Sequence, residues 1–518
     1  MKSQLSRRQL LEAGVLGAFS LSAGCGRRGS AAPMAPPERA PAALEVRLKA
    51  TPARVLVDGR REAPTNVLRF EGTLLAGPSG ALSQDETRYL GPTFRVRPGE
   101  RVRVLFENGL GEPSIVHWHG LDVAEENDGH PRFAVGAGGH RRYELRVENR
   151  PGTYWYHPHP HERTGYQVQA GMAGLFIVGD GDDVARGLPG TEFDLPLVVQ
   201  DRIIDAAGEL LYAPDPMLGF LGDRVLVNGR TDASFDVRAG TYRLRLLNGS
   251  NARIYKLAWS DGRPMQVIGT DGGLLAAPVT CPYLMLAPAE RAEVWADFAG
   301  VGDGNVVWLE SRPFTIGDGM MGGGMMGMGM MGGGRSAGRS LPNGAPFRIC
   351  RFAVTGKGTP LPVPRHFSPL AWRSPEEVVN RAAPRRFTVS MAMMRWMLNG
   401  HPFEMDDLDA NERIRLGVTE DWEFANTIGT MTTAHPIHVH GGQFQIVERR
   451  VAPSWREAAA TMEAGLVDAG WKDTFLLRPG ERVRIRVRFT HHAGLFLYHC
   501  HNLEHEDMGM MRNFRVDA

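Results

Sequence analysis

Alternating polar and apolar residues follow a proline-containing turn at three places along the chain. Residues 97–104 read RPGERVRV, residues 478–485 read RPGERVRI, and residues 287–294 form a weaker copy, APAERAEV. This alternation predicts a β-strand with one buried face. The chain has 518 residues, and each third of it holds one copy. The pattern therefore predicts three related β-domains, each built of short strands that are separated by Gly and Pro.

Length, composition and charge agree with this organisation. Hydrophobic residues make up 42% of the chain, which is ample for three cores in domains of about 150 residues. The formal net charge is +1, so charge gives no reason to expect nucleic acid or an anionic membrane surface as a partner. We predict domains at 44–182, 183–358 and 359–518, the last beginning with a Pro-rich connection.

The C-terminal stretch carries a dense group of soft metal ligands: His499, Cys500, His501, His505 and Met510. In an extended strand, His499 and His501 point to one side and Cys500 to the other. Two His, one Cys and a weak axial Met form the ligand set of a blue copper site. The motif therefore predicts a copper site on one face and part of a second metal centre on the opposite face.

Three further motifs are rich in histidine. They read HWH at 117–119, HPH at 157–159 and HPIHVH at 435–440, and together with the C-terminal motif they hold ten of the 17 histidines. A single HxH pair is weak evidence for a metal site, because two histidines on one strand face are common. All four motifs in one chain favour a multinuclear centre.

The four motifs resemble those of three-domain bacterial multicopper oxidases of the laccase and cuprous oxidase kind. The resemblance runs from about residue 44 to the C-terminus. It implies an all-β fold of three cupredoxin-like Greek-key β-barrel domains, and four copper ions. The first and third domains would share a three-copper centre, because the middle domain has no HxH motif.

The resemblance also implies a role for each ligand. The type 1 copper would bind His435, Cys500 and His505, with Met510 axial. The type 2 copper would bind His117 and His438. His161 extends the second motif to HPHPH, but the preceding GTYWY at 152–156 favours His157 and His159. The ligands implied for the type 3 pair are His119, His157, His159, His440, His499 and His501.

The implied activity couples four one-electron oxidations to the reduction of O2 to two waters. Cys500 would relay electrons, and Asp128 and Glu506 would relay protons, although either carboxylate could be merely structural. We expect a laccase-like range of phenols, aromatic amines or low-valent metal ions. Periplasmic cuprous oxidation for copper tolerance is the alternative, and a metal-free scaffold, such as one acting in cell division, is a third hypothesis.

Two stretches bear on the choice between laccase and cuprous oxidase. Residues 431–434 read MTTA, whereas cuprous oxidases of the family place an Asp and a Met there. A Met- and Gly-rich insertion at 317–334 argues the other way, since thioethers select Cu(I). It could equally be a flexible insert without ligands. Its methionines are Met320, Met321, Met325, Met326, Met328, Met330 and Met331.

The N-terminus predicts export of the protein. Residues 6–11 read SRRQLL, which resembles a twin-arginine signal, and residues 1–43 as a whole read as signal and disordered linker. We therefore expect a periplasmic or cell-envelope protein that is monomeric, with Cys25 as a candidate lipid-anchor site. In an oxidising compartment, Cys281 and Cys350 could pair.

Overall fold

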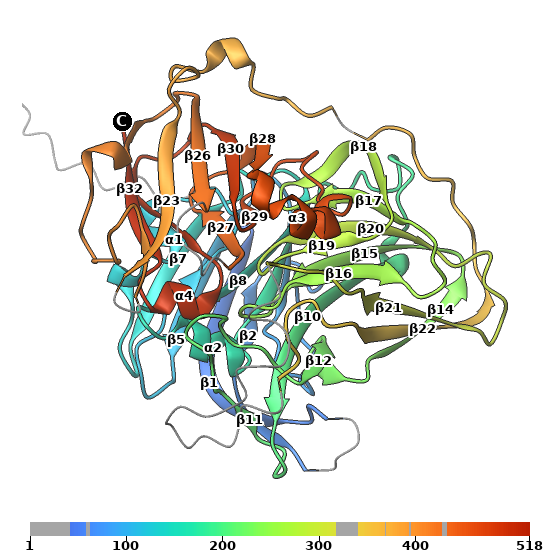
Figure 1. Cartoon of the computed structure of the whole chain (residues 1–518). Coiled ribbons are helices and arrows are strands. Elements are labelled where there is room, and N and C mark those ends of the chain that lie inside the picture. The colour runs from blue at the N-terminus through green and yellow to red at the C-terminus, as the bar shows by residue number, and fades with distance from the viewer. Residues whose placement is uncertain (1–41, 59–62, 318–339, 368, 393–394, 427–432) are drawn as a thin grey trace, which may run out of the picture. The chain divides into compact units, whose positions relative to one another are not determined.

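The computed structural model describes residues 42–58, 63–317, 340–367, 369–392, 395–426 and 433–518, in which β-strands predominate (Figure 1). The strands form sheets that fall into three consecutive pairs along the chain. None of the helices in the described residues has the length and apolar character needed to span a bilayer. The predicted all-β class is confirmed.

The first pair consists of the sheets β2-β1-β5-β7 and β3-β4-β9-β8-β6. Side chains from both sheets, among them Phe94, Phe106 and Phe176, share one core with Trp118. The elements are β1 (Leu44–Val55), β2 (Thr65–Ala76), β3 (Leu82–Ser83), β4 (Thr93–Val96), β5 (Arg101–Asn108), β6 (Val116–His117), α1 (Glu125–Asp128), η1 (Pro131–Phe133), β7 (His140–Arg146), β8 (Gly152–Pro158), α2 (Thr164–Gln169) and β9 (Gly174–Val178).

The second pair consists of β13-β12-β10-β15-β20-β17-β18, with β11 on β10, and β14-β22-β21-β16-β19. Val294 and Phe352 come from the two sheets and lie in one core. The elements are η2 (Thr191–Phe193), β10 (Asp194–Ile204), β11 (Leu210–Leu211), β12 (Arg224–Val227), β13 (Arg230–Thr231), β14 (Ser234–Ala239), β15 (Thr241–Asn248), β16 (Tyr255–Trp259), β17 (Met265–Thr270), β18 (Gly273–Cys281), β19 (Leu284–Leu286), β20 (Arg291–Asp297), β21 (Val306–Ser311) and β22 (Phe347–Lys357).

The third pair consists of β24-β23-β26-β30-β28 and β25-β32-β31-β27-β29. Phe424 and Phe496 lie in its common core. The elements are η3 (Pro375–Glu377), β23 (Arg385–Ala392), β24 (Arg395–Leu398), η4 (Ala410–Glu412), β25 (Arg413–Arg415), β26 (Glu420–Asn426), β27 (His435–Val439), β28 (Phe444–Val451), η5 (Pro453–Trp455), α3 (Arg456–Glu463), β29 (Thr474–Leu477), β30 (Glu481–Val487), β31 (Gly494–Cys500), α4 (Leu503–Asp507) and β32 (Met511–Asp517). The boundaries predicted at 182 and 358 stay predictions.

The three repeated motifs open the strands β5, β20 and β30. β5 alternates between buried and more exposed residues, as predicted for a half-buried strand. β20 does not, because all of its residues except Asp297 are buried. It lies between β15 and β17 and also contacts β8 of the first pair. The strand formed by the middle copy of the repeat is therefore covered on both faces. Its charged residues Arg291 and Glu293 form ion pairs with buried side chains.

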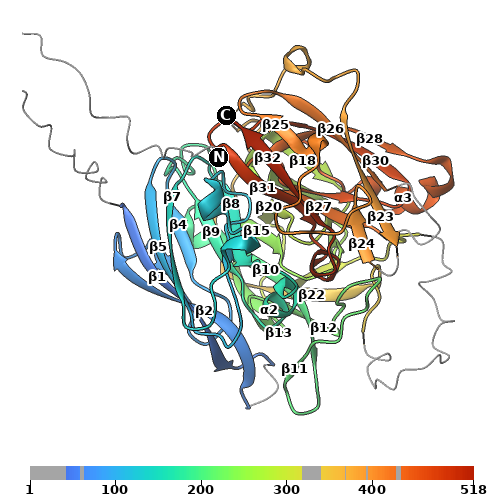
Figure 2. The same cartoon turned by 90° about the vertical axis from the view of Figure 1, so that its left-hand side faces the viewer.

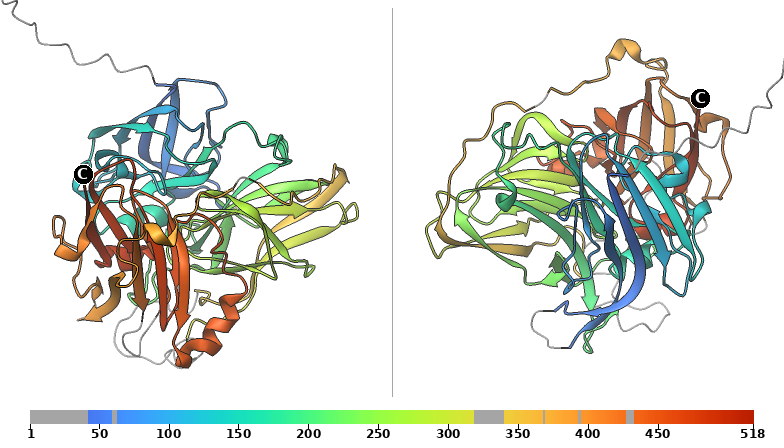
Figure 3. Two further views of the ribbon diagram at one scale, coloured as in Figure 1. Left: turned by 90° about the horizontal axis from the view of Figure 1, so that it is seen from above. Right: turned by 180° about the vertical axis from the view of Figure 1, so that it is seen from behind.

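Strands of the first and third pairs lie close together, as two turned views show (Figures 2 and 3). Helix α2 packs against α4, and α1 contacts β31. The sequence left open whether Cys281 and Cys350 pair; in the structure both are free, buried thiols. Cys281 ends β18 in one sheet, whereas Cys350 lies in β22 of the other.

Candidate metal centre

Two neighbouring strands carry His435, His438 and His499 of the third and fourth motifs. β27 runs antiparallel to β31, with Ile437 opposite Cys500 and His438 opposite His499. Because side chains alternate along a strand, His435 and Cys500 share one face, whereas His438 and His499 share the other. The division of the C-terminal motif into two faces is thus present in the structure.

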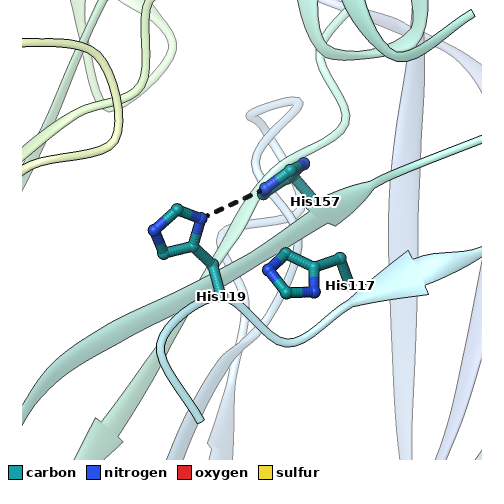
Figure 4. A group of neighbouring side chains, drawn as sticks. All are labelled: His117, His119 and His157. Carbon is teal, nitrogen blue, oxygen red and sulfur yellow. Dashed lines mark hydrogen bonds between the residues drawn. The ribbon is translucent and has the colours of Figure 1, made fainter. Parts of the chain in front are cut away.

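The first two motifs meet through β6 and β8. These strands pair with His117 opposite His157. The side chains of His117 and His157 on these strands and of His119 just after β6 lie close together (Figure 4), and His119 Nδ1 lies 3.4 Å from His157 Nε2. A backbone hydrogen bond from His159 N–H to Ile115 O continues the pairing beyond the strand ends.

Eight buried histidines meet at this junction, and we call them the histidine cluster: His117, His119, His157, His159, His438, His440, His499 and His501. Their ring nitrogens form one pair and two triplets. The pair is His117 and His438, whose Nε2 atoms lie 3.3 Å apart. In the first triplet, His157 Nε2 is 3.4 Å from both His119 Nδ1 and His501 Nε2.

The second triplet is formed by His159, His440 and His499. His499 Nε2 lies 3.0 Å from His440 Nε2 and 3.4 Å from His159 Nε2. Two nitrogens that each bind one ion at about 2.0 Å, at a tetrahedral angle, are about 3.3 Å apart. The spacing in the pair and in both triplets therefore fits metal ions held between the rings.

The opposite face of β27 and β31 carries a second site. We call it the cysteine site, and it consists of His435, Cys500 and His505. Cys500 Sγ lies 3.5 Å from His435 Nδ1 and 3.8 Å from His505 Nδ1, and these two nitrogens are 3.3 Å apart. All three side chains are fully buried. One sulfur and two imidazole nitrogens converge as the ligands of one soft metal ion do.

Burial keeps the imidazoles of both sites neutral, which is the form that binds a metal ion. It lowers the pKa of His505 and of His157 to about 3, and that of His159 to about 4, with further lowering of the latter two by neighbouring imidazoles. Neutral imidazoles have a free lone pair, as metal binding requires. Burial also raises the pKa of the Cys500 thiol, so a bound metal ion is needed to hold it as thiolate.

Comparison with known proteins identifies this arrangement. The family description "Multicopper oxidase" matches residues 78–183 and 378–518. A laccase of Bacillus stratosphericus is 30% identical over 480 residues, covering 82% of this chain and 88% of that protein. The chain belongs to the multicopper oxidase family. Copper is therefore its cofactor, and the protein is an oxidoreductase that uses O2, as the motifs predicted.

A solved structure and a second relative are also similar to this oxidase. The crystal structure of the McoA multicopper oxidase from Aquifex aeolicus superimposes with a TM-score of 0.75 at 31% identity, covering 92% of this chain and 97% of that one. This confirms the predicted cupredoxin-like β-domains. The cell division protein FtsP of Pectobacterium atrosepticum is 30% identical and covers 82% of each chain, so the family also includes proteins named for cell division.

In this oxidase, Asp128 lies at the edge of the histidine cluster and contacts two of its members. Its Oδ2 is 2.7 Å from His440 Nδ1, and its backbone carbonyl is 2.6 Å from His117 Nδ1. Both contacts hold a proton on Nδ1 and leave the Nε2 lone pair facing the cluster. Burial raises the pKa of Asp128 well above its usual value.

Glu506 lies on the other side of the cluster. It is 3.0 Å from His499 Nδ1 and 3.6 Å from His159 Nε2. Burial acts to raise the pKa of Glu506, but contact with His159 and His499 outweighs it and lowers that pKa. The two predicted relay carboxylates thus differ in their affinity for a proton.

Met510 joins the cysteine site through the backbone. Its N–H donates to His505 O at 2.9 Å, and its carbonyl accepts from Cys500 N–H at 3.0 Å. Its side chain is fully buried in the core that contains Cys500, whereas Met508 is only partly buried. His161 stays outside the cluster, with its side chain 36% exposed and its ring against Phe403.

The outer edge of the cysteine site is covered by other parts of the chain. The ring of Trp396 lies 4.4 Å from that of His505, and its Nε1–H donates to Pro216 O at 3.0 Å. His505 Nε2 lies 3.1 Å from Met217 O. A segment of the middle domain therefore lies directly over a ligand of the third domain.

Sequence reasoning missed Asp473, which groups with His119 and His438. One signal was available, because this carboxylate directly precedes the fully buried strand β29. Several predicted features lie outside the described residues: the export signal, Cys25, insertion residues 318–334, and residues 431–432 of the stretch before His435.

Proposed function

We propose that this oxidase binds four copper ions and is a laccase-like enzyme. The type 1 copper is held by His435, Cys500 and His505 with Met510 axial, and the type 2 copper by His117 and His438. The two triplets hold the type 3 pair. The observation that carries this proposal is the grouping of ring nitrogens into one pair and two triplets next to the cysteine site.

When bound, copper would accept single electrons from a substrate at the cysteine site and deliver four of them to O2 at the histidine cluster. The chain supplies the connection between these sites. Cys500 is bonded directly to His499 and continues to His501, and both point into the cluster. The two sites are therefore joined by a short covalent path through neighbouring residues.

Protons reach the cluster through the two buried carboxylates. Asp128 contacts His440 and Glu506 contacts His499, so the carboxylates lie at different edges of the same triplet. Each is placed to pass a proton toward the space between the rings while it orients a histidine. This arrangement supports a relay role for both residues.

The proposed substrate class rests on the covering of His505 by Met217 and Trp396. The His505 side chain is fully buried, and Nε2–H is already donated to Met217 O. A substrate therefore gives up its electron across Met217 and Trp396 rather than by bonding to the ligand itself. Such transfer suits donors of varied shape, which favours phenols, aromatic amines and low-valent metal ions. Cuprous oxidation for copper tolerance stays the second candidate, favoured by the Met-rich insertion.

The similarity to FtsP keeps a metal-free scaffold as a third hypothesis. A scaffold has no need for eleven converging His and Cys side chains with Met510 buried in the core that contains Cys500, and this chain has all of them. We further propose export by the twin-arginine route to the periplasm or cell envelope, and a monomeric state. Lipid attachment at Cys25 belongs to the same proposal.

The test is O2 uptake by the copper-loaded protein with Cu(I) or 2,6-dimethoxyphenol as the donor. The proposal expects uptake with the phenol, and a phenol activity that is lost in Cys500→Ser. Protein that takes up no copper and consumes no O2 with either donor would favour the metal-free scaffold. O2 uptake with Cu(I) but not with the phenol would favour the cuprous oxidase.

A further inference from the structure

Asp473 lies fully buried between the histidine cluster and the middle domain. Its Oδ1 is 3.1 Å from His119 Nε2 and accepts from Thr474 Oγ1 at 3.0 Å. Arg291 of β20 donates to both carboxylate oxygens, with Nη1 at 2.7 Å from Oδ1 and Nη2 at 2.5 Å from Oδ2. A residue of the middle domain thus makes a two-bond ion pair next to a predicted copper ligand.

All five N–H donors of the Arg291 side chain have acceptors. Besides the two bonds to Asp473, Nε donates to Thr153 O at 3.0 Å, Nη1 to Ala289 O and Nη2 to Asp271 O, both at 3.1 Å. Thr153 lies on β8, the strand that carries His157. Arg291 therefore joins all three domains, and the planar fork of a guanidinium is needed to reach every partner.

His119 differs from the other seven histidines of the cluster. It presents Nδ1 to its triplet, whereas the others present Nε2. A neutral imidazole has one N–H and one lone pair, and a carboxylate facing Nε2 holds the proton there. The side chain of Asp473 therefore leaves the lone pair of His119 on the nitrogen that faces the centre.

Asp473 acts on a second ligand through its backbone. Its carbonyl lies 2.8 Å from His438 Nδ1, which keeps the Nε2 lone pair of His438 toward His117. One residue thus orients members of both the pair and the first triplet. A shift of Asp473 would disturb the two sites together, while the cysteine site has no contact with it.

We propose that Arg291 is a positioning residue for the three-copper centre: by clamping Asp473 it makes His119 bind through Nδ1. The inference rests on the proposed function, because it takes the histidine cluster as the three-copper centre. The middle domain, which contributes no ligand, then determines the geometry of a centre shared by the other two domains.

The test compares Arg291→Lys and Asp473→Asn with a matched control pair. Arg253 and Asp201 form a buried ion pair of the middle domain, with Nε at 2.7 Å from Oδ2 and no bond to the histidine cluster. Arg253→Lys and Asp201→Asn therefore remove a similar pair at a distance from the ligands. Each variant is loaded with copper, and its copper content, blue absorbance, type 2 and type 3 spectra and urea midpoint are measured.

We expect the Arg291 and Asp473 variants to lose copper affinity at the histidine cluster by about tenfold or more, while the blue absorbance stays. The controls should lose stability yet keep full copper and normal spectra. Normal type 2 and type 3 spectra in Asp473→Asn, or equal loss of all coppers, would overturn the proposal. If Arg291→Lys does not fold, Asp473→Asn, which keeps the side-chain volume, decides. Wild-type protein without copper would instead refute the proposed function itself.

Discussion

Replacing Asp128 by Asn should slow the reduction of O2 without affecting the cysteine site. Asp128 touches the cluster twice, through Oδ2 to His440 Nδ1 at 2.7 Å and through its backbone carbonyl to His117 Nδ1 at 2.6 Å. The substitution replaces the carboxyl group by an amide, which cannot take up or release a proton. It keeps the side-chain volume and the bond to His117, so the fold around α1 should persist.

The magnitude follows from the kind of contact that is lost. Loss of a carboxylate that orients a metal-bound histidine costs about 10- to 100-fold in activity or metal affinity. This equals about 1.4–2.7 kcal/mol of transition-state or binding free energy. The cysteine site has no contact with Asp128, so its reduction by substrate should keep the wild-type rate.

Two measurements separate these steps. Stopped-flow loss of the blue absorbance without O2 reports substrate oxidation, and reoxidation of the reduced protein by O2 reports the cluster. Glu126→Gln is the matched control, because Glu126 lies on the same helix but is exposed. Equal slowing of both steps in Asp128→Asn, or slowing of neither, would refute the role that we assign to Asp128.

Further predictions concern the cysteine site, the second carboxylate, the insertion and acid stability. Cys500→Ser should abolish the blue colour and turnover but keep the fold; a variant that stays blue would contradict the ligand assignment. Glu506→Gln should slow reoxidation by O2 more than substrate oxidation, measured by single turnover. Deleting residues 317–334 should abolish Cu(I) oxidation but spare phenol oxidation if the insertion delivers Cu(I), and unchanged rates would make it a spacer. Burial raises the pKa of Glu293, but Arg243 and Arg245 outweigh this and lower it to about 2, so this carboxylate stabilises the fold above pH 4.5 by about 3 kcal/mol. That stability should disappear between about pH 4.5 and 2, and Glu293→Gln should show a smaller loss in urea titrations over this range.

The sequence was sufficient for features that depend on local spacing. Strand alternation placed Cys500 and His499 on opposite faces, and β27 and β31 show this arrangement. Family resemblance implied that His117 and His438 form one set and six further histidines another, but not how those six divide into triplets. The lead-in GTYWY at 152–156 favoured His157 over His161, which stays outside the cluster. The strand faces and the choice of His157 needed only a few consecutive residues, whereas the ligand sets came from the resemblance.

Contacts between distant segments could not be predicted in this way. Asp473 and Arg291 are far apart in the sequence and meet because the segment just before Asp473 lies against the middle domain, where Trp471 O accepts from Gly272 N–H. The same holds for Met217, whose carbonyl covers His505. Arg291 even belongs to the repeat that predicted a half-buried strand, and burial of both faces of β20 overturned that expectation.

The most direct test of the central claim is the electron balance of O2 reduction by protein of known copper content. The account predicts four copper ions per chain and one O2 consumed for every four electrons taken from a phenol, with water as the product. An O2 electrode, a copper assay and a peroxide assay on one preparation measure all three quantities. One O2 for every two electrons with release of peroxide, or a fully active protein with a single copper ion, would contradict the account.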